Sequence, residues 1–204
     1  MMKAASRYLK PLVFVLCALP AISLVYAAFN NGLGANPVET ITHVTGEWGL
    51  RFLLVTLAVT PLRKLTGLST IMRVRRMIGL YAFFYVCVHL LTYVWLDAYF
   101  SLSYIWGDLA KRLYIAAGFA GFCMMLPLAI TSTNKMIRRL GTKRWQRLHQ
   151  LVYVAALAGL LHFWWLVKAD VREPLFYAAF FALLMLFRIR PIATRLSRLR
   201  NATA

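Results

Sequence analysis

Long apolar runs divide the chain, and most charged residues lie in the short segments between them. Runs of about 17 to 25 apolar residues are typical of helices that cross a bilayer. Six such runs predict six transmembrane helices, near residues 11–29, 47–62, 77–96, 113–131, 148–167 and 174–190. No strand-type alternation or internal repeat interrupts the pattern. We therefore expect an all-α integral membrane protein, with residues 1–204 forming one six-helix transmembrane bundle.

Composition agrees with this class. Apolar residues make up 61% of the 204 residues, and 24 Lys and Arg outnumber six acids. That is too apolar for an ordinary soluble domain. The net charge of +18 also suggests nucleic-acid binding, but membrane topology accounts for the position of nearly all of it. We expect no nucleic-acid partner.

The charges also predict an orientation, because Lys and Arg near helix ends favour the cytoplasm. The N-terminus, the loops at 63–76 and 135–147 and the segment 188–200 hold 19 of the 24 basic residues. The six acids fall at the opposite helix ends: Glu39, Glu47, Asp97, Asp108, Asp170 and Glu173. Both termini are therefore expected to be cytoplasmic. Residues 191–204 would form a basic cytoplasmic tail against anionic lipid headgroups.

The first apolar run has a second interpretation. A basic start followed by an apolar stretch and small residues is also typical of a cleaved secretory signal. The run is about 19 residues long, longer than a usual signal core, and a cytoplasmic N-terminus agrees with every later loop. We expect residues 1–27 to be retained, with cleavage as the alternative.

Histidines inside apolar segments are the candidate functional residues, since ionisable groups in a membrane mark functional sites. In a bundle of alternating direction the third and fifth helices run parallel. At 1.5 Å per residue, His89 lies about 20 Å above Arg76 and His162 about 22 Å above Arg147. The two histidines are thus expected at nearly equal depth, in the outer half of the membrane. His149 lies near the cytoplasmic edge, and His43 opens the second helix on the outer side.

Two facing imidazoles limit the ligand. A structural zinc ion needs four protein ligands and a catalytic one three plus water, and only Cys87 offers another ligand at this depth. A haem needs just two axial ligands, because its porphyrin supplies four nitrogens. The ligand count therefore favours haem, with His89 and His162 on the iron. Hydrogen bonding between helices is the alternative for both.

The other two histidines each have two interpretations. His149 is either an interfacial residue or a further haem ligand, and His43 fits a helix start or loop better than a ligand. On an ideal helix His149 and His162 point roughly 140° apart. Arg75 and Arg76 occupy the depth at which His149 would need a partner histidine. A second haem would therefore require His149 plus an unusual ligand.

Three segments resemble a known family: residues 31–63 (NGLGANPVETITHVTGEWG and onward), 73–97 (RVRRMIGLYAFFYVCVHLLTYVWLD) and 131–168 (TSTNKMIRRLGTKRWQRLHQLVY and onward). The chain is similar to the MsrQ (YedZ) family, the haem-binding membrane subunits of a bacterial periplasmic methionine-sulfoxide reductase system, within the ferric-reductase-like transmembrane superfamily. The three segments cover most of residues 30–168.

The resemblance implies b-type haem bound through His89 in VCVHLLTY, His149 in QRLHQLVY and His162 in LLHFWW. It also implies FMN, for which the sequence shows no phosphate-cradling glycine loop. It places the protein in a bacterial inner membrane, taking electrons from the quinone pool or a separate cytoplasmic flavin reductase. The electrons would go to a molybdenum-cofactor catalytic subunit that repairs oxidised methionines in periplasmic proteins. Two-haem members of the superfamily carry a fourth histidine where this chain has Arg75 or Arg76.

We therefore expect an electron conduit with no catalytic residue of its own, paired with that subunit as a heterodimer. A transporter with histidines as proton relays is a second class, although the chain lacks the duplicated halves common in transporters. A haem-free membrane anchor is a third. A ferric reductase is the nearest rival within the redox class.

Overall fold

The computed structural model describes residues 2–188, with side chains from residue 8 onward. Within this part every regular element is helical. The long helices are α1 (Met2–Phe29), α2 (Pro37–Thr66), α3 (Met72–Thr92), α5 (Leu113–Ile130), α8 (Leu151–Leu166) and α9 (Arg172–Leu186). The short ones are α4 (Leu102–Lys111), α6 (Asn134–Leu140) and α7 (Thr142–Leu148). The expected basic tail at 191–204 lies outside the described residues.

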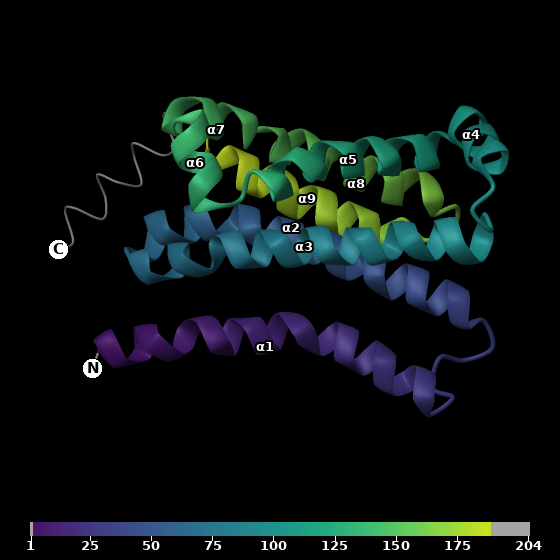
Figure 1. Cartoon of the computed structure of the whole chain (residues 1–204), viewed down its shortest axis with the longest axis horizontal. Coiled ribbons are helices and arrows are strands. Elements are labelled where there is room, and N and C mark those ends of the chain that lie inside the picture. The colour runs from purple at the N-terminus through teal and green to yellow at the C-terminus, as the bar shows by residue number, and fades with distance from the viewer. Residues whose placement is uncertain (1, 189–204) are drawn as a thin grey trace.

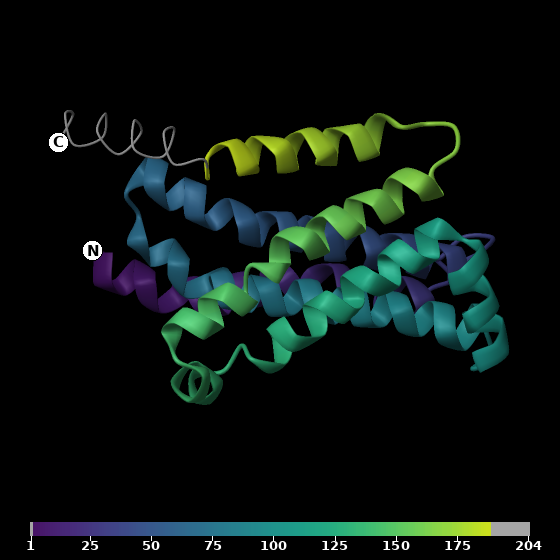
Figure 2. The same cartoon turned by 90° about the horizontal axis from the view of Figure 1, so that it is seen from above.

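The long helices run along one axis of the molecule (Figures 1 and 2). Helix α2 packs mainly against α3, and α5 mainly against α8. Helix α1 lies to one side of α3, and α9 lies beside α2 and α8. Helix α4 caps one end of the bundle, and α6 and α7 lie at the other end, where α1 begins and α9 ends (Figure 1). The basic loops thus share one end of the molecule.

Four helical stretches are long and apolar enough to cross a membrane: Tyr8–Phe29, Ser69–Asp97, Leu113–Ile130 and Thr142–Leu166. They indicate a multi-pass membrane protein. Helices α2 and α9 are the other two elements that the sequence predicts to be spans. Helix α2 carries charged residues in its first half and at its end, and α9 has 15 residues.

Helix α2 begins ten residues before the apolar run that predicts it. Asn36 caps it by accepting a hydrogen bond from the Glu39 amide at 3.3 Å and donating one to the Glu39 carboxylate at 3.0 Å. Pro37 follows the cap, where its fixed backbone and missing N–H suit a helix start. This reciprocal cap places His43 inside the helix instead of at its opening.

Helix α3 passes into a π-helical turn, η2 (Tyr93–Asp97), before the chain turns towards α4. Asp108 of α4 is buried, accepts a hydrogen bond from the Tyr93 hydroxyl at 3.0 Å and pairs with Arg112 at 3.2 Å. These contacts fix α4 across the end of α3. The sequence pattern predicts no helix here, because a ten-residue surface helix leaves no long apolar run.

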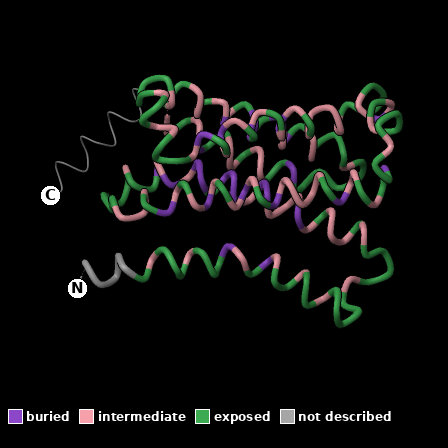
Figure 3. The backbone as a smooth tube through the Cα atoms, viewed as in Figure 1, coloured by how far each residue is buried: buried purple, intermediate pink, exposed green. Residues whose placement is uncertain are grey.

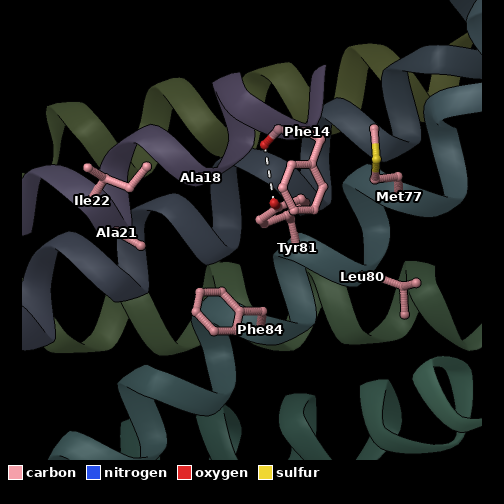
Figure 4. Close-up of a pocket in the computed structure, with 8 residues that line it drawn as sticks. All are labelled: Phe14, Ala18, Ala21, Ile22, Met77, Leu80, Tyr81 and Phe84. Atoms are coloured by element: carbon pink, nitrogen blue, oxygen red, sulfur yellow. Dashed lines mark hydrogen bonds between the residues drawn. The ribbon is translucent and has the colours of Figure 1, made fainter. Parts of the chain in front are cut away.

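Buried residues gather where α2, α3 and α8 meet, whereas α1 is mostly exposed (Figure 3). In a bilayer, exposed apolar side chains of this kind face lipid. An apolar groove of about 480 Å³ separates part of α1 from α3 (Figure 4). Helix α1 is therefore in direct contact with α3 along only part of its length.

Tyrosine hydroxyls make the specific contacts between α1 and α3. Tyr85 is fully buried, donates to the Cys17 carbonyl at 2.9 Å and accepts from the Ala21 amide at 2.9 Å. An uninterrupted helix would join that carbonyl and amide directly. Pro20 lies between them and lacks an N–H, which weakens the helix at this point. Tyr81 makes a more exposed bond to the Phe14 carbonyl at 3.1 Å (Figure 4).

We predict that Tyr85→Phe lowers the free energy of unfolding by about 1–3 kcal/mol, because it leaves a buried amide and carbonyl without their shared partner. Tyr81→Phe is the matched control and should change stability by less than about 1 kcal/mol, because its hydrogen bond is exposed. Unfolding of the full chain in detergent measures both. Equal effects of the two changes would contradict the assigned role of Tyr85.

Candidate functional site

His89 and His162 face each other between α3 and α8. Their ring centroids are 5.8 Å apart and the ring planes are nearly perpendicular, at 84°. His89 lies in the last turn of α3, and His162 lies near the end of α8. Both side chains are half-buried. The structure thus brings together two of the four histidines, from helices distant in sequence.

The His89 ring is oriented by α2. Its Nδ1 lies 2.8 Å from the carbonyl oxygen of Thr42. A carbonyl only accepts hydrogen bonds, so Nδ1 must carry the hydrogen and donate it. The Nε2 atom of the neutral ring is then left with a lone pair, as metal coordination requires.

His162 repeats the arrangement with α5. Its Nδ1 lies 2.7 Å from the carbonyl oxygen of Tyr114, so it is also the donor. Both rings therefore hold the same tautomer, each with an Nε2 lone pair available. Ligating histidines in proteins usually make this kind of bond to a carbonyl or carboxylate through their second nitrogen.

A glycine beneath each ring makes room for it. A Cβ atom at Gly46 of α2 would lie 3.0 Å from the His89 ring, and one at Gly118 of α5 would lie 2.7 Å from His162 Nδ1. Each glycine comes four residues, about one helical turn, after the carbonyl that its histidine contacts. The pairs α2/α3 and α5/α8 thus hold their histidines in the same way.

The pair could supply two ligands to one metal ion within a larger cofactor. Bonds from imidazole nitrogen to metal are about 2 Å long, so rings on opposite sides of one ion have centroids about 6 Å apart. The observed 5.8 Å is close to this value. No group of three or more His, Cys, Asp or Glu side chains suited to a metal ion occurs among the described residues. Two nitrogen donors without a third protein ligand suit an ion that brings its own in-plane ligands, as haem iron does.

Aromatic residues lie only partly around the pair. Phe83 of α3 stacks on Phe122 of α5 with ring centroids 5.8 Å apart. This stack connects the α2/α3 pair with the α5/α8 pair. Tyr85 points towards α1 instead. Trp164 and Trp165 are exposed, as expected of residues near a membrane boundary.

His149 lies apart from the other histidines, at the junction of α7 and α8. Its ring stacks on Trp145 with centroids 3.8 Å apart, and its Nε2 lies 3.1 Å from the Thr131 hydroxyl. Arg75 is close enough to interact with it electrostatically. Arg76 turns elsewhere and donates to the Asn134 side chain at 2.7 Å. Of the two arginines, Arg75 is therefore the neighbour of His149.

His43 is exposed on α2 and lines a small polar pocket with Glu39, Thr42 and Asp97. Thr42 thus lines this pocket and also supplies the carbonyl that holds His89. His43 does not join the central pair.

The carbonyls and glycines that hold the rings are absent from the set of residues that the sequence singles out. Backbone carbonyls carry no sequence signal of their own. The glycines do, since small residues within apolar helices mark close helix packing. The Asn36–Glu39 cap is the signal that would have extended α2 far enough to include Thr42 and Gly46.

Comparison with known proteins places the site in a family context. Residues 45–160 match the model of the ferric reductase like transmembrane component. A protein-methionine-sulfoxide reductase heme-binding subunit MsrQ from Rhodospirillum rubrum is 51% identical over 183 residues, covering 90% of this chain and 88% of that protein. The subunit of the same name from Herminiimonas arsenicoxydans is 46% identical, covering 89% and 84%. The one from Polaromonas naphthalenivorans is 50% identical, covering 88% and 83%.

We predict that Gly118→Ala destabilises the protein by about 1–3 kcal/mol, because the added methyl group forces the His162 ring from its place against Tyr114. Gly107→Ala in α4 is the control: a Cβ there meets no atom within 4 Å, and the change should be neutral or slightly stabilising. Apparent melting temperatures of the full chain compare the two. If Gly118→Ala melts with Gly107→Ala, the ring is not confined as described.

Proposed function

The chain belongs to the MsrQ family of haem-binding subunits, within the ferric-reductase-like transmembrane family, and on that basis we propose that it is a haem b electron-transfer subunit of a methionine-sulfoxide reductase system. The observation that carries this proposal is the pair of imidazoles whose Nδ1 atoms are both committed to backbone carbonyls. That arrangement leaves the Nε2 atom of each ring available to a metal, on two rings whose centroids are 5.8 Å apart.

In this proposal His89 and His162 would hold the haem, and the haem would supply a centre that gains and loses single electrons. The chain itself sets the orientation and basicity of the two imidazoles and the polarity of their surroundings. The carbonyls of Thr42 and Tyr114 orient the rings and make them more basic ligands. The surrounding apolar helices keep the site dry, and burial is one of the factors that set a haem's reduction potential. In this proposal the chain relays electrons and leaves the bond chemistry on the substrate to its partner subunit.

We further infer six spans in a bacterial inner membrane, with both termini cytoplasmic. Helices α2 and α9 would be the additional spans, because they lie along the same axis as the four apolar ones (Figure 1). The basic loops at the end holding α6 and α7 then face the cytoplasm. His89 and His162 lie nearer the other end, which supports outward transfer to a periplasmic molybdenum-cofactor subunit. Quinone or a separate cytoplasmic flavin reductase would supply electrons from the inner side.

His149 remains a candidate for a further haem ligand. Its neighbour Arg75 does not supply the second imidazole of a bis-histidine site, so a haem there would need another ligand. FMN belongs to the proposal only through the family, because the sequence offers no glycine-rich phosphate loop.

We predict that His89→Ala and His162→Ala each remove most of the haem, because each deletes one of two axial ligands, whereas His43→Ala retains it. A pyridine haemochrome assay per mole of detergent-purified protein measures the loading. Elution on size exclusion as for the wild type shows that a colourless variant is still folded.

Normal haem loading in His89→Ala would refute the axial pair. A wild-type protein without haem, made with adequate haem supply, would favour a proton relay or a membrane anchor. Rapid reduction of ferric chelates by the haem protein, without delivery to a methionine-sulfoxide reductase, would favour a ferric reductase.

A further inference from the structure

Helix α4 turns a carboxylate inward and its largest apolar side chains outward. Asp108 is only 7% exposed, and is held by the Tyr93 hydroxyl at 3.0 Å and by Arg112 at 3.2 Å. Leu102 and Trp106 are 82% and 77% exposed. A surface helix in water does the reverse, with its apolar stripe against the core and its charged residues in solvent. The orientation of α4 therefore indicates that an apolar medium covers this face.

The exposed side of α4 is divided into an apolar and a polar stripe. Leu102 and Trp106 are four residues apart, so they lie one above the other on the helix. Ser103 and Lys111 are also exposed and share the neighbouring stripe, with Gly107 between them. A helix that lies flat at a membrane boundary has this division, because one stripe enters the apolar layer and the other stays in water.

Exposed aromatic and apolar residues also flank α4 in the chain. Tyr99 and Phe100 come directly before the helix, and both are exposed with backbone φ angles of 47° and 57°. A left-handed backbone is unfavourable for bulky side chains and is retained only where the surrounding structure imposes it. Leu113 follows the helix and is exposed as well. Tyrosine and tryptophan gather at membrane boundaries, because their rings combine an apolar body with a polar group.

The apolar layer nearest to α4 is the bilayer itself. Two of the stretches that can cross a membrane, Ser69–Asp97 and Leu113–Ile130, end and begin on either side of it, so residues 98–112 are the whole connection between them. Figure 1 shows α4 at the end of the bundle, beside the start of α5. Trp95 and Leu113, at the ends of these stretches, are exposed and would face lipid. The apolar stripe of α4 thus continues a surface that contacts lipid.

We propose that α4 is an interfacial helix. The Leu102 and Trp106 side chains enter the bilayer at the boundary between headgroups and acyl chains, while Ser103 and Lys111 stay in water. The connection at 98–112 holds one acid and two basic residues, and the acid, Asp108, pairs with Arg112. Little net charge is left to attract anionic lipid. Binding therefore depends on apolar contact, and a zwitterionic phospholipid is sufficient.

This contact fixes the depth of the helix that carries His89. Tyr93, which holds Asp108, follows His89 by four residues, about 6 Å along the helix. Because α4 joins the membrane surface to this turn, it sets how far the histidine pair lies from that surface. The membrane contact itself needs neither haem nor electron transfer.

Spin labels test which stripe of α4 meets lipid. The full-length protein is first freed of its native thiols by the changes Cys17→Ala, Cys87→Ala and Cys123→Ala, and is placed in phosphatidylcholine nanodiscs. A single added cysteine, Leu102→Cys or Trp106→Cys, then carries a nitroxide on the apolar stripe. Lys111→Cys is the matched control on the polar stripe. Collision of each label with oxygen, which concentrates in lipid, is compared with its collision with a water-soluble nickel chelate.

We predict that oxygen reaches the labels at positions 102 and 106 more often than the nickel chelate does, because both labels lie in the apolar layer. The order should be reversed at position 111, where the label lies in water. The reversal between two stripes of one helix distinguishes an interfacial helix from one that is wholly submerged or wholly in solvent.

Two results would overturn the proposal. If the nickel chelate reaches positions 102 and 106 as readily as position 111, the apolar stripe faces water and is free for a soluble partner. If both labels are protected from both reagents, another protein, such as a second copy of the chain, covers the stripe. Should the cysteine-free protein not fold, the fluorescence lost in Trp106→Phe is measured instead. Bromine atoms high on the acyl chains should quench it in the wild type, and no quenching would refute contact with lipid.

Discussion

The structure depends on a hydrogen bond from an imidazole to a backbone carbonyl of the neighbouring helix, made across a glycine. Thr42 and Gly46 supply the carbonyl and the space for His89, and Tyr114 and Gly118 supply them for His162. A side chain at either glycine would push the ring away from its acceptor. The bond also decides the chemistry of the ring, because it fixes the hydrogen on Nδ1 and leaves Nε2 as the donor to a metal. The same hydrogen bond, made across a glycine, thus joins the two helices and decides which nitrogen of the ring can bind a metal.

Other features follow from how closely these helix pairs approach. Gly49 continues the contact of α2 with α3, where a Cβ would lie 2.9 Å from Val86. Gly121 lies at the contact of α5 with α8, where an added Cβ would lie 3.5 Å from the Ala155 carbonyl, an ordinary packing distance. Helix α1 has no such contact and relies on the Tyr85 hydroxyl, which enters its backbone ladder beside Pro20. The bundle therefore has two tightly joined pairs and a more loosely attached first helix.

The sequence was sufficient for the helical membrane class and the family, and it singled out the two histidines that the structure places face to face. Apolar run length and charge position are strong signals because the bilayer imposes them directly. It could not give the length of α2, since its first turns are polar and only the Asn36 cap marks their start. It also missed helix α4 and the second contact of each imidazole. Carbonyl acceptors are common to every residue, so only the fold can show which of them His89 and His162 reach.

The separation of acids and bases along the bundle also gives the molecule an electrical polarity. Arginines and lysines crowd the end with α6 and α7, while the acids belong to the end with α4. An added negative charge has lower energy near the basic end, because fixed charges create a potential that extends beyond their own contacts. In the proposed outward direction, an electron leaving through the α4 end would move uphill against the chain's own charges. The driving force for such a transfer would then come from the acceptor and from the voltage across the membrane.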